Sequence, residues 1–414
     1  MIENREIQEK VVLVAVAGSS PDNELSAVKE SLLELRELVK TAGAETVGEV
    51  IQNREAIHNG TYIGKGKIDE VAALVAETGA HGIITDDELS PAQMKNLEDA
   101  LGCKVMDRTM LILDIFAKHA STREGTIQVE LAQLRYRSTR LIGAGSEMSR
   151  LGGGIGTRGP GEKKLEVDRR LIKDRIAQLR RELQEVQKNR ETQRAQRERS
   201  AVPVIAIVGY TNAGKSTLLN RLTGAGVLSM DMLFATLDPT TRSYKTEDGQ
   251  ELLFTDTVGF IRKLPHHLVD AFRSTLEEAK YADLVLHVVD ASGDCPDVQM
   301  QVVYETLEKL GIQDKPIVTA MNKQDLSVQH VVKDLRADRV VKISAKSGDG
   351  VPELVDTICA VLREQKTYLE KVIPYTEAGK IAEIRKYGEL ISEEYEAEGI
   401  LVKAYLPKNY PGNL

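Results

Sequence analysis

Residues 209–216, GYTNAGKS, have the spacing G-x-x-x-x-G-K-[ST] that binds phosphate groups. An apolar run lies before them at 204–209 and a helical pattern lies after them, which is the context that such a loop requires. Backbone N–H groups and the helix N-terminus would face phosphate oxygens, Lys215 would neutralise the β- and γ-phosphates, and the Ser216 hydroxyl would ligate Mg²⁺. The residues predicted to contact a nucleotide here are Gly209, Tyr210, Thr211, Asn212, Ala213, Gly214, Lys215, Ser216 and Thr217.

A second motif distinguishes GTP from ATP, which a phosphate-binding loop alone does not do. Asn322-Lys323-Gln324-Asp325 follows the apolar run 316–321, so the Asp325 carboxylate would lie at the end of a strand. A carboxylate there accepts both N–H groups of the guanine edge, and adenine offers no such pair. The segment Ser344-Ala345-Lys346 follows the next β-type run and would close over the base, with Ala345 acting through its backbone.

A third motif, Asp256-Thr257-Val258-Gly259, ends the run ELLFTDT. The Asp would reach Mg²⁺ through a water molecule, and the glycine N–H would hold a γ-phosphate oxygen. The four spaced elements together predict a GTPase domain like those of translation factors, with GTP or GDP and Mg²⁺ as its cofactors.

The threonine that closes on Mg²⁺ should lie between the first helix and ELLFTDT. The segment Phe234-Ala235-Thr236-Leu237-Asp238-Pro239-Thr240-Thr241 offers three candidates. Residue chemistry alone does not separate Thr236, Thr240 and Thr241.

Phe260 occupies the position after D-x-x-G, where many GTPases have a Gln that orients the attacking water. A phenyl ring cannot position water by hydrogen bonding, so the sequence predicts slow hydrolysis until a partner supplies order or a catalytic group. The alternative is that Phe260 only packs the neighbouring helix. His266 and His267 are interpreted as residues that cap or decorate a helix, and Arg262 and Lys263 as weak candidates for charge stabilisation.

The remaining pattern predicts a multidomain α/β protein, because 414 residues exceed one compact domain. Alternating β-type runs (11–17, 46–51, 82–85, 103–106) and helical segments (24–42, 66–78, 90–101) predict an N-terminal α/β domain over 1–120 with a largely parallel sheet. Apolar runs at 204–209, 251–257, 283–290, 316–322 and 340–344 predict a mainly parallel sheet with helices on both faces, the GTPase domain of 201–366. Residues 367–414, with two β runs around a helix at 376–387, predict a small C-terminal α/β domain.

Residues 121–200 are expected to form a helical hairpin around a glycine-rich loop at 143–161. Eight glycines between 141 and 162 predict that no helix persists there, because each costs about 1 kcal/mol relative to Ala. Beyond the loop, apolar residues at heptad-like spacing from Leu165 to Val186 predict a seam that packs on 123–142.

Charge is distributed unevenly along the chain. Residues 123–200 carry a formal charge of +8, whereas the remainder carries −16. Aromatic residues make up 4% with no Trp, which argues against stacking platforms for single-stranded nucleic acid. The basic region, joined to a flexible loop with Arg150 and Arg158, therefore favours contact with a phosphate backbone.

Targeting and redox signals indicate a cytoplasmic protein. The N-terminal apolar run 11–17 is too short for a signal peptide, and no apolar stretch approaches the roughly 20 residues of a membrane helix. The three cysteines are far apart, as expected in a reducing compartment. A monomer is expected.

The chain resembles the HflX family of ribosome-associated GTPases. The resemblance is carried by FATLDPT, DTVGF and especially GIGTRGPGEKKLEVDRR at 154–170, and it spans nearly the whole chain. It implies that Thr236 ligates Mg²⁺ with Ser216 and that 234–238 is a switch segment, so that Lys215, Thr236 and Gly259 serve catalysis. It also implies binding to the large ribosomal subunit near the peptidyl-transferase region, and a role in splitting or rescuing ribosomes under stress. The residues predicted to contact ribosomal RNA are Arg150, Gly152, Gly153, Gly154, Gly156, Arg158, Gly159 and Gly161.

Two other functions fit the sequence. One is a non-hydrolytic switch, in which GTP binding alone orders the contact surface. The other is an RNA-remodelling or RNA-modifying factor in which residues 1–120 have their own chemistry. Gly64-Lys65-Gly66-Lys67 is interpreted as a loop that enters a helix, since it does not match a phosphate-binding loop.

Overall fold

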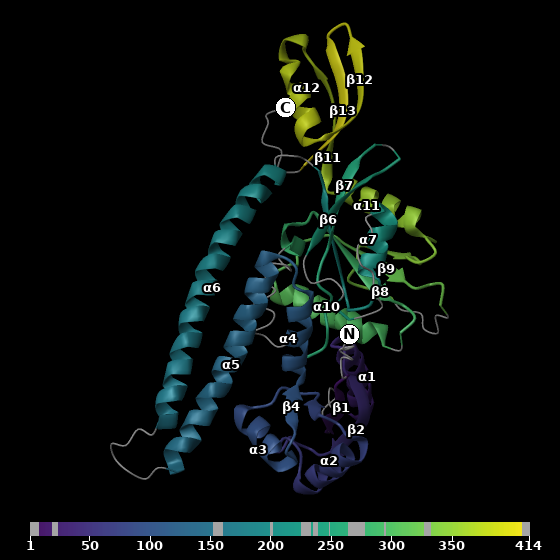
Figure 1. Ribbon diagram of the computed structural model, residues 1–414. Coiled ribbons are helices and arrows are strands. Elements are labelled where there is room, and N and C mark those ends of the chain that lie inside the picture. The colour runs from purple at the N-terminus through teal and green to yellow at the C-terminus, as the bar shows by residue number, and fades with distance from the viewer. Residues whose placement is uncertain are drawn as a thin grey trace, which may run out of the picture. The chain divides into compact units, whose positions relative to one another are not determined.

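The computed structural model describes residues 8–18, 24–151, 160–198, 202–224, 233–234, 239–247, 249–263, 278–293, 295–326 and 333–407 (Figure 1). The chain divides into two units. Unit 1 comprises residues 1–184, 231–237 and 262–272, and unit 2 comprises residues 185–230, 238–261 and 273–414.

A four-stranded parallel sheet forms the centre of unit 1, as the sequence predicts. Its strands are β1 (Lys10–Ala17), β2 (Glu45–Asn53), β3 (Gly82–Thr85) and β4 (Lys104–Asp107), in the order β2-β1-β3-β4. The helices are α1 (Leu25–Thr41), α2 (Lys65–Thr78), α3 (Pro91–Leu101) and α4 (Arg108–His119). Val12, Leu13 and Val14 of β1 are all buried, so both faces of the sheet are covered.

Local capping explains where α3 begins. The Ser90 hydroxyl accepts a hydrogen bond from Gln93 N, the Gln93 side chain accepts one from Ser90 N, and Pro91 occupies the first turn. The predicted start of this helix is confirmed.

Two long helices follow, α5 (Arg123–Leu151) and α6 (Pro160–Glu198). The expectation that no helix persists between 141 and 162 is wrong at both ends, since α5 contains Gly143 and Gly145 and α6 begins at Pro160. Single glycines reduce helix stability without ending a helix, and Pro is favoured in a first helical turn. Residues 152–159, most of the predicted loop, lie outside the described residues.

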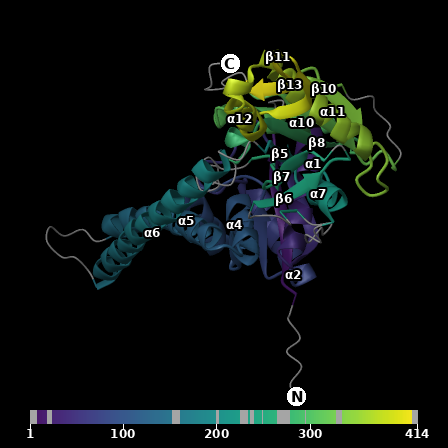
Figure 2. The same ribbon diagram turned by 90° about the horizontal axis from the view of Figure 1, so that it is seen from above.

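The first part of α6 lies beside α5, as Figures 1 and 2 show from two directions. The Arg175 guanidinium donates to both carboxylate oxygens of Glu130, at 2.7 and 2.9 Å. Leu179 is buried, and Ile172, Ile176 and Leu183 are half-buried. These residues belong to the predicted seam.

The Asp107 carboxylate joins α5 to the end of β4. One oxygen accepts the Met110 N–H at 2.9 Å and caps α4, and the other accepts Tyr136 Oη–H at 2.6 Å and Arg140 Nη2–H at 2.7 Å. The Arg140 guanidinium also lies over the Tyr136 ring, 3.2 Å from its centroid. Asp107 is fully buried, so α5 is fixed by a desolvated charge that has several partners.

A six-stranded sheet forms the centre of unit 2, in the order β10-β9-β8-β5-β7-β6. The strands are β5 (Val204–Gly209), β6 (Thr240–Lys245), β7 (Glu251–Asp256), β8 (Leu284–Asp290), β9 (Ile317–Asn322) and β10 (Arg339–Lys342). All pairs are parallel except β6 with β7. The five parallel strands confirm the predicted sheet, whereas β6 was not predicted.

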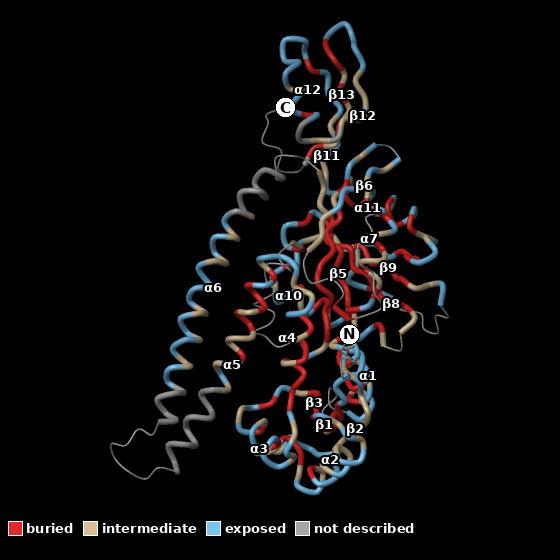
Figure 3. Tube along the Cα trace, in the orientation of Figure 1, coloured by how far each residue is buried: buried red, intermediate tan, exposed pale blue. Residues whose placement is uncertain are grey.

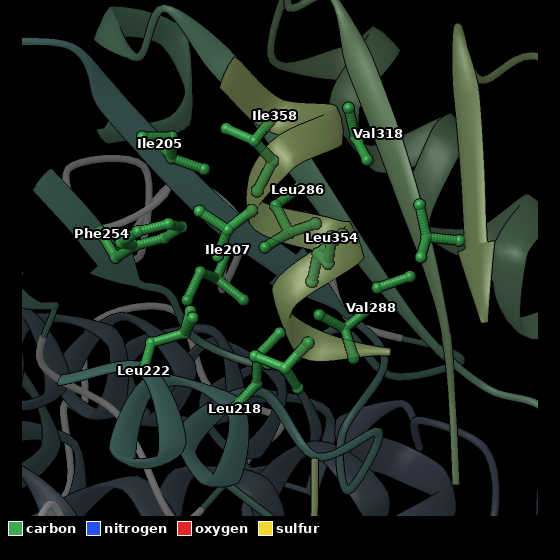
Figure 4. Packing of buried hydrophobic residues seen from close by; sticks show 14 of the residues in the cluster. Ile205, Ile207, Leu218, Leu222, Phe254, Leu286, Val288, Val318, Leu354 and Ile358 are labelled. Atoms are coloured by element: carbon green, nitrogen blue, oxygen red, sulfur yellow. The ribbon is translucent and has the colours of Figure 1, made fainter. Parts of the chain in front are cut away.

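Helices cover both faces of this sheet. On one face, α7 (Lys215–Thr223) and α11 (Val351–Glu364) place Leu218, Leu354 and Ile358 against Ile207 and neighbouring strand residues (Figure 4). On the other face, Met300 of α10 (Pro296–Lys309) joins a cluster with Val289 and Met321. Strands β5 and β8 are buried along their length except at Val204 and Asp290, and Figure 3 shows this burial.

The C-terminal segment of unit 2 forms a three-stranded antiparallel sheet. Its elements are β11 (Lys366–Ile373), the 3₁₀ turn η2 (Tyr375–Glu377), α12 (Gly379–Tyr387), β12 (Glu389–Glu396) and β13 (Gly399–Pro407). The helix and two of the strands were predicted, and β12 was not. Ile384 of α12 packs against Val402 and Ala404 of β13.

Replacing Asp107 by Ala should lower the free energy of unfolding of unit 1 by about 3–5 kcal/mol, because it leaves Arg140 and Tyr136 without their buried acceptor. Hydrogen exchange of the β1 and β3 amides in the full chain, measured against urea concentration, reports this energy. Glu37→Ala is the matched control, since Glu37 forms an exposed pair with Lys40 and its loss should cost less than about 1 kcal/mol. Equal losses in the two variants would contradict the anchoring role of Asp107.

Candidate functional site

The phosphate-binding loop connects β5 to α7 and depends on a close approach at Gly214. Its φ is 94°, and a Cβ added there would lie 2.3 Å from Asn322 Nδ2. Only glycine fits this position. The loop therefore lies directly against the end of β9, which carries the guanine motif.

The Lys215 ammonium is buried inside this loop. It donates to Gly209 O at 3.2 Å and to Tyr210 O at 2.7 Å. Burial lowers the pKa of Lys215 to about 8, although the nearby charge of Asp256 acts in the opposite direction. The cation is thus positioned by backbone carbonyls, and within the described ranges no carboxylate is bound directly to it.

Ser216 and Asp256 provide the oxygen atoms that Mg²⁺ prefers. The Ser216 hydroxyl donates to Asp256 Oδ2 at 2.8 Å, and Asp256 is fully buried at the end of β7. This hydroxyl and carboxylate pair fits the predicted arrangement, in which Ser216 ligates the ion and Asp256 acts through water. The Thr257 hydroxyl instead donates to Ile207 O at 2.8 Å, so its side chain holds two strands together.

Gly259 allows the D-x-x-G segment to approach the phosphate-binding loop. A Cβ at this position would lie 2.8 Å from Thr211 Cγ2 and 3.0 Å from Lys215 Nζ. A side chain would fill the space beside the ammonium group. The geometry therefore suits the predicted role of Gly259 as a close backbone contact to the γ-phosphate.

Phe260 is held in the interior by its backbone and its ring. Its N–H donates to Gly209 O at 3.1 Å, its carbonyl accepts from Thr211 N at 2.8 Å, and the residue is 2% exposed. The ring is buried, but residues 264–277, which follow this segment, lie outside the described residues, so packing of Phe260 on a neighbouring helix stays a prediction. The ring also offers no hydrogen bond to water, which agrees with the predicted lack of a water-positioning side chain.

Asn322 joins the phosphate and guanine halves of the site. Its Nδ2 donates to Ala213 O at 2.8 Å, and its Oδ1 accepts the Ala345 N–H at 2.9 Å. Ser344 Oγ donates to Asp325 Oδ1 at 2.7 Å and lowers the pKa of that carboxyl group. The structure thus brings together the loops that the sequence assigned to guanine.

Two further lysines of these motifs have defined positions. Lys323 has a positive φ of 63°, and its ammonium pairs with Asp290 Oδ2 at 2.6 Å. Lys346 follows Ala345, and its carbonyl accepts a hydrogen bond from the Arg221 guanidinium.

Arg221 is a site residue that sequence reasoning missed. It lies on α7, and its guanidinium donates to the carbonyl of Ala345 at 3.3 Å as well as to that of Lys346. Helix α7 thereby supports the loop that is predicted to close over the base. In the sequence, the only indication of this role is the position of Arg221 six residues after Lys215, because Arg221 lies outside every motif.

The switch candidates are only partly described. Phe234 is buried, and its ring lies 4.6 Å from the Phe116 ring in an edge-to-face contact within unit 1. Thr240 and Thr241 lie in β6, where Thr240 pairs with Asp256 and the Thr241 hydroxyl bonds to that of Thr255 at 2.9 Å. Residues 235–238, including Thr236, and His266 and His267 lie outside the described residues.

Arg262 and Lys263 form ion pairs within unit 1. Lys263 Nζ lies 2.5 Å from Asp86 Oδ2 and 2.6 Å from Asp87 Oδ1, and Arg262 pairs with Glu30 at 3.1 Å. Burial alone would raise the pKa of Asp86, but the cations of Arg108 and Lys263 lower it. These contacts give no support to a role for Arg262 or Lys263 in charge stabilisation at the nucleotide.

Of the predicted RNA-contact residues, the structure describes only the first, Arg150, and the last, Gly161. Arg150 belongs to the last turn of α5 and Gly161 to the first turn of α6. Gly152, Gly153, Gly154, Gly156, Arg158 and Gly159 lie outside the described residues. The Gly64 segment is a loop entering α2, as predicted, with Gly64 at the N-cap and its N–H bonded to Gln52 Oε1.

Comparison with known proteins assigns the chain to a family. Residues 29–117 match the family described as GTP-binding GTPase N-terminal, 119–197 match GTP-binding GTPase Middle Region, and 204–323 match 50S ribosome-binding GTPase. GTPase HflX of Lacrimispora saccharolytica is 62% identical over 408 residues, which cover 98% of this chain and 96% of the relative. The chain belongs to the HflX GTPase family. It is therefore a GTPase, as its motifs predict.

A more distant HflX relative gives the same assignment. GTPase HflX of Escherichia coli is 46% identical over 336 residues, which cover 80% of this chain and 78% of the relative. A GTP-binding protein from the archaeon Sulfolobus solfataricus, solved in complex with GDP, is 26% identical. That comparison covers 86% of this chain and 99% of the other, with a TM-score of 0.46.

No group of three or more His, Cys, Asp or Glu residues in the ranges given above could hold a metal ion. Within the same ranges, no helix is long and apolar enough to cross a membrane.

Replacing Asp325 by Asn should shift preference from GTP to XTP, because the amide donates a hydrogen bond where the carboxylate accepted one. The dissociation constants of both nucleotides, measured in parallel for parent and variant, test this expectation. Unchanged affinities would remove Asp325 from base recognition.

Replacing Arg221 by Ala should weaken GTP and ITP equally, because the Ala345 loop that Arg221 holds is predicted to close over the base of either nucleotide. A loss of about 10-fold is expected, the equivalent of one hydrogen bond of about 1.4 kcal/mol. The GTP-to-XTP ratio should stay at the parent value, in contrast to Asp325→Asn. Parent-like GTP and ITP affinities would show that Arg221 does not support this loop.

Nucleotide binding should take up a proton between pH 8 and 9, since phosphate oxygens favour the charged form of Lys215, whose pKa is about 8. GDP affinity should accordingly fall as pH rises above 8. Calorimetry in two buffers of different ionisation enthalpy measures the proton uptake. Lys215→Arg, which stays charged, should show no uptake, and an equal uptake in that variant would exclude Lys215 as the titrating group.

Proposed function

We propose that this chain is a Mg²⁺-dependent GTPase that binds the large ribosomal subunit and couples its GTP state to ribosome dissociation or rescue under stress. The observation that carries the proposal is the Asn322 bridge, which joins a guanine-selective loop to a phosphate-binding loop. It lies in residues 204–323, the segment that matches a family described as 50S ribosome-binding GTPase. Such a role belongs to the cytoplasm.

Ser216 and Thr236 hold Mg²⁺ directly in this proposal, with Asp256 acting through water. The contact between Ser216 Oγ and Asp256 Oδ2 supports the roles of Ser216 and Asp256. Thr236 is favoured because Thr241 and Thr240 are both engaged in the β6–β7 pairing. The ion would neutralise charge on the β- and γ-phosphates, and Lys215 would neutralise the rest.

Slow intrinsic hydrolysis is the second part of the proposal. The buried Phe260 ring offers no donor or acceptor to the attacking water. The ribosome would then supply order or a catalytic group. A non-hydrolytic switch remains the second candidate, because the same burial of Phe260 would also suit a protein that acts through GTP binding alone.

Ribosomal RNA would be contacted by the basic hairpin and the glycine-rich segment. Arg170, Lys173, Arg180 and Arg181 are exposed on α6. Arg150, Arg158 and the glycines at 152, 153, 154, 156, 159 and 161 would bring backbone N–H groups and guanidinium groups to phosphates. Binding through such contacts weakens as salt rises.

Co-sedimentation with isolated large subunits tests the partner. The parent should sediment with a non-hydrolysable GTP analogue and much less with GDP. Shortening residues 152–159 should preserve GTP binding and abolish sedimentation. If the shortened chain sediments at the parent affinity, the segment is only a linker.

A charge-reversal pair tests the hairpin separately. Arg180→Glu with Arg181→Glu should weaken large-subunit binding and reduce its salt dependence, because two phosphate contacts are lost. Lys371→Glu with Lys380→Glu in the C-terminal sheet domain makes the same change in net charge and serves as the control. Equal effects of the two pairs would indicate non-specific electrostatic attraction.

A further inference from the structure

The Thr211 hydroxyl is buried without a hydrogen-bond partner. Thr211 is 6% exposed, and among the described residues its Oγ1 has neither donor nor acceptor within reach. Its backbone N–H is already bonded to Phe260 O. The loop geometry therefore does not need this hydroxyl.

A buried hydroxyl without a hydrogen-bond partner destabilises the protein unless a ligand supplies that partner. A hydroxyl removed from water loses its hydration and regains nothing in an unpaired site. Valine has nearly the same shape and would avoid this cost. A buried Thr without a protein partner therefore indicates that a ligand supplies the partner.

The position of Thr211 points to the phosphate end of the nucleotide. A Cβ at Gly259 would lie 2.8 Å from Thr211 Cγ2, 2.9 Å from its Cα and 3.0 Å from Lys215 Nζ. Thr211 and the Lys215 ammonium thus border the same small volume beside Gly259. It is the methyl group that faces Gly259, and a rotation of χ1 by about 120°, from one staggered rotamer to the next, brings the hydroxyl to the position that the methyl holds.

We propose that Thr211 Oγ1–H donates a hydrogen bond to a terminal oxygen of the γ-phosphoryl group in the GTP complex. GDP lacks this oxygen, so the bond distinguishes the two nucleotides. As hydrolysis proceeds, charge is redistributed over the phosphoryl oxygens, and a fixed donor stabilises it. Thr211 is then a catalytic residue that stabilises charge on the transferred phosphoryl group.

Thr211→Val tests the proposal, because it keeps the shape and removes the donor. The dissociation constant of a non-hydrolysable GTP analogue should rise about 10-fold, while that of GDP stays within about twofold. The single-turnover hydrolysis rate should fall at least 10-fold. GDP binding also reports that the variant is folded.

Thr211→Ser keeps the donor and removes the methyl group, so its GTP-analogue affinity and rate should lie within about threefold of the parent. Thr306→Val is the matched control, since the Thr306 hydroxyl bonds to Val302 O within α10. It should leave both constants unchanged. Thr211→Ala provides a second donor-free variant if the valine chain does not fold.

Three results would overturn the proposal. Parent-like affinity and rate in Thr211→Val would show that the hydroxyl contacts nothing in the complex. An equal loss for GDP and the GTP analogue would indicate a structural role. A defect in Thr211→Ser as large as that in Thr211→Val would assign the effect to methyl packing.

Discussion

The Asn322 carboxamide is the interaction on which the nucleotide site depends. Its two ends bond to the backbones of Ala213 and Ala345, which belong to the phosphate-binding and guanine-binding loops. The absence of a side chain at Gly214 lets the amide approach. Because the carboxamide is buried, neither bond can be exchanged for water without cost. The loops predicted to contact the base and the phosphates are consequently held together by this one side chain.

The same constraint supports the proposal that this chain binds GTP tightly but hydrolyses it slowly on its own. The phosphate loop, Lys215 and the Ser216–Asp256 pair are held by strands of a buried sheet. Phe260 adds two backbone hydrogen bonds to this frame, and its ring takes no part in polar chemistry. The site is thus well arranged to hold charged phosphates. Activation of the attacking water requires a polar group, and the Phe260 side chain does not provide one.

Much of this arrangement could be predicted from the sequence, because buried parallel strands read as apolar runs and the motifs follow their carboxyl ends. Strands β6 and β12 were missed since TTRSYK and ELISEEYE are polar edge segments without such runs. The helical state of Gly143 and Gly145 was missed because helix propensity is a weak constraint within a long helix. Arg221 lies outside the motifs and Thr211 lies at a motif position that accepts any side chain, so only the three-dimensional structure could reveal the contacts of Arg221 and the unpaired hydroxyl of Thr211.

The proposed dependence of hydrolysis on a partner rests on the contrast between an ordered binding site and a buried Phe260. The most direct measurement is the single-turnover rate of prebound GTP, with and without a saturating concentration of isolated large ribosomal subunits. A slow rate alone and an increase of at least about 100-fold with subunits are predicted, the scale on which added catalytic groups act in GTPases. An unstimulated rate, or a rate that is already fast without subunits, would contradict the account.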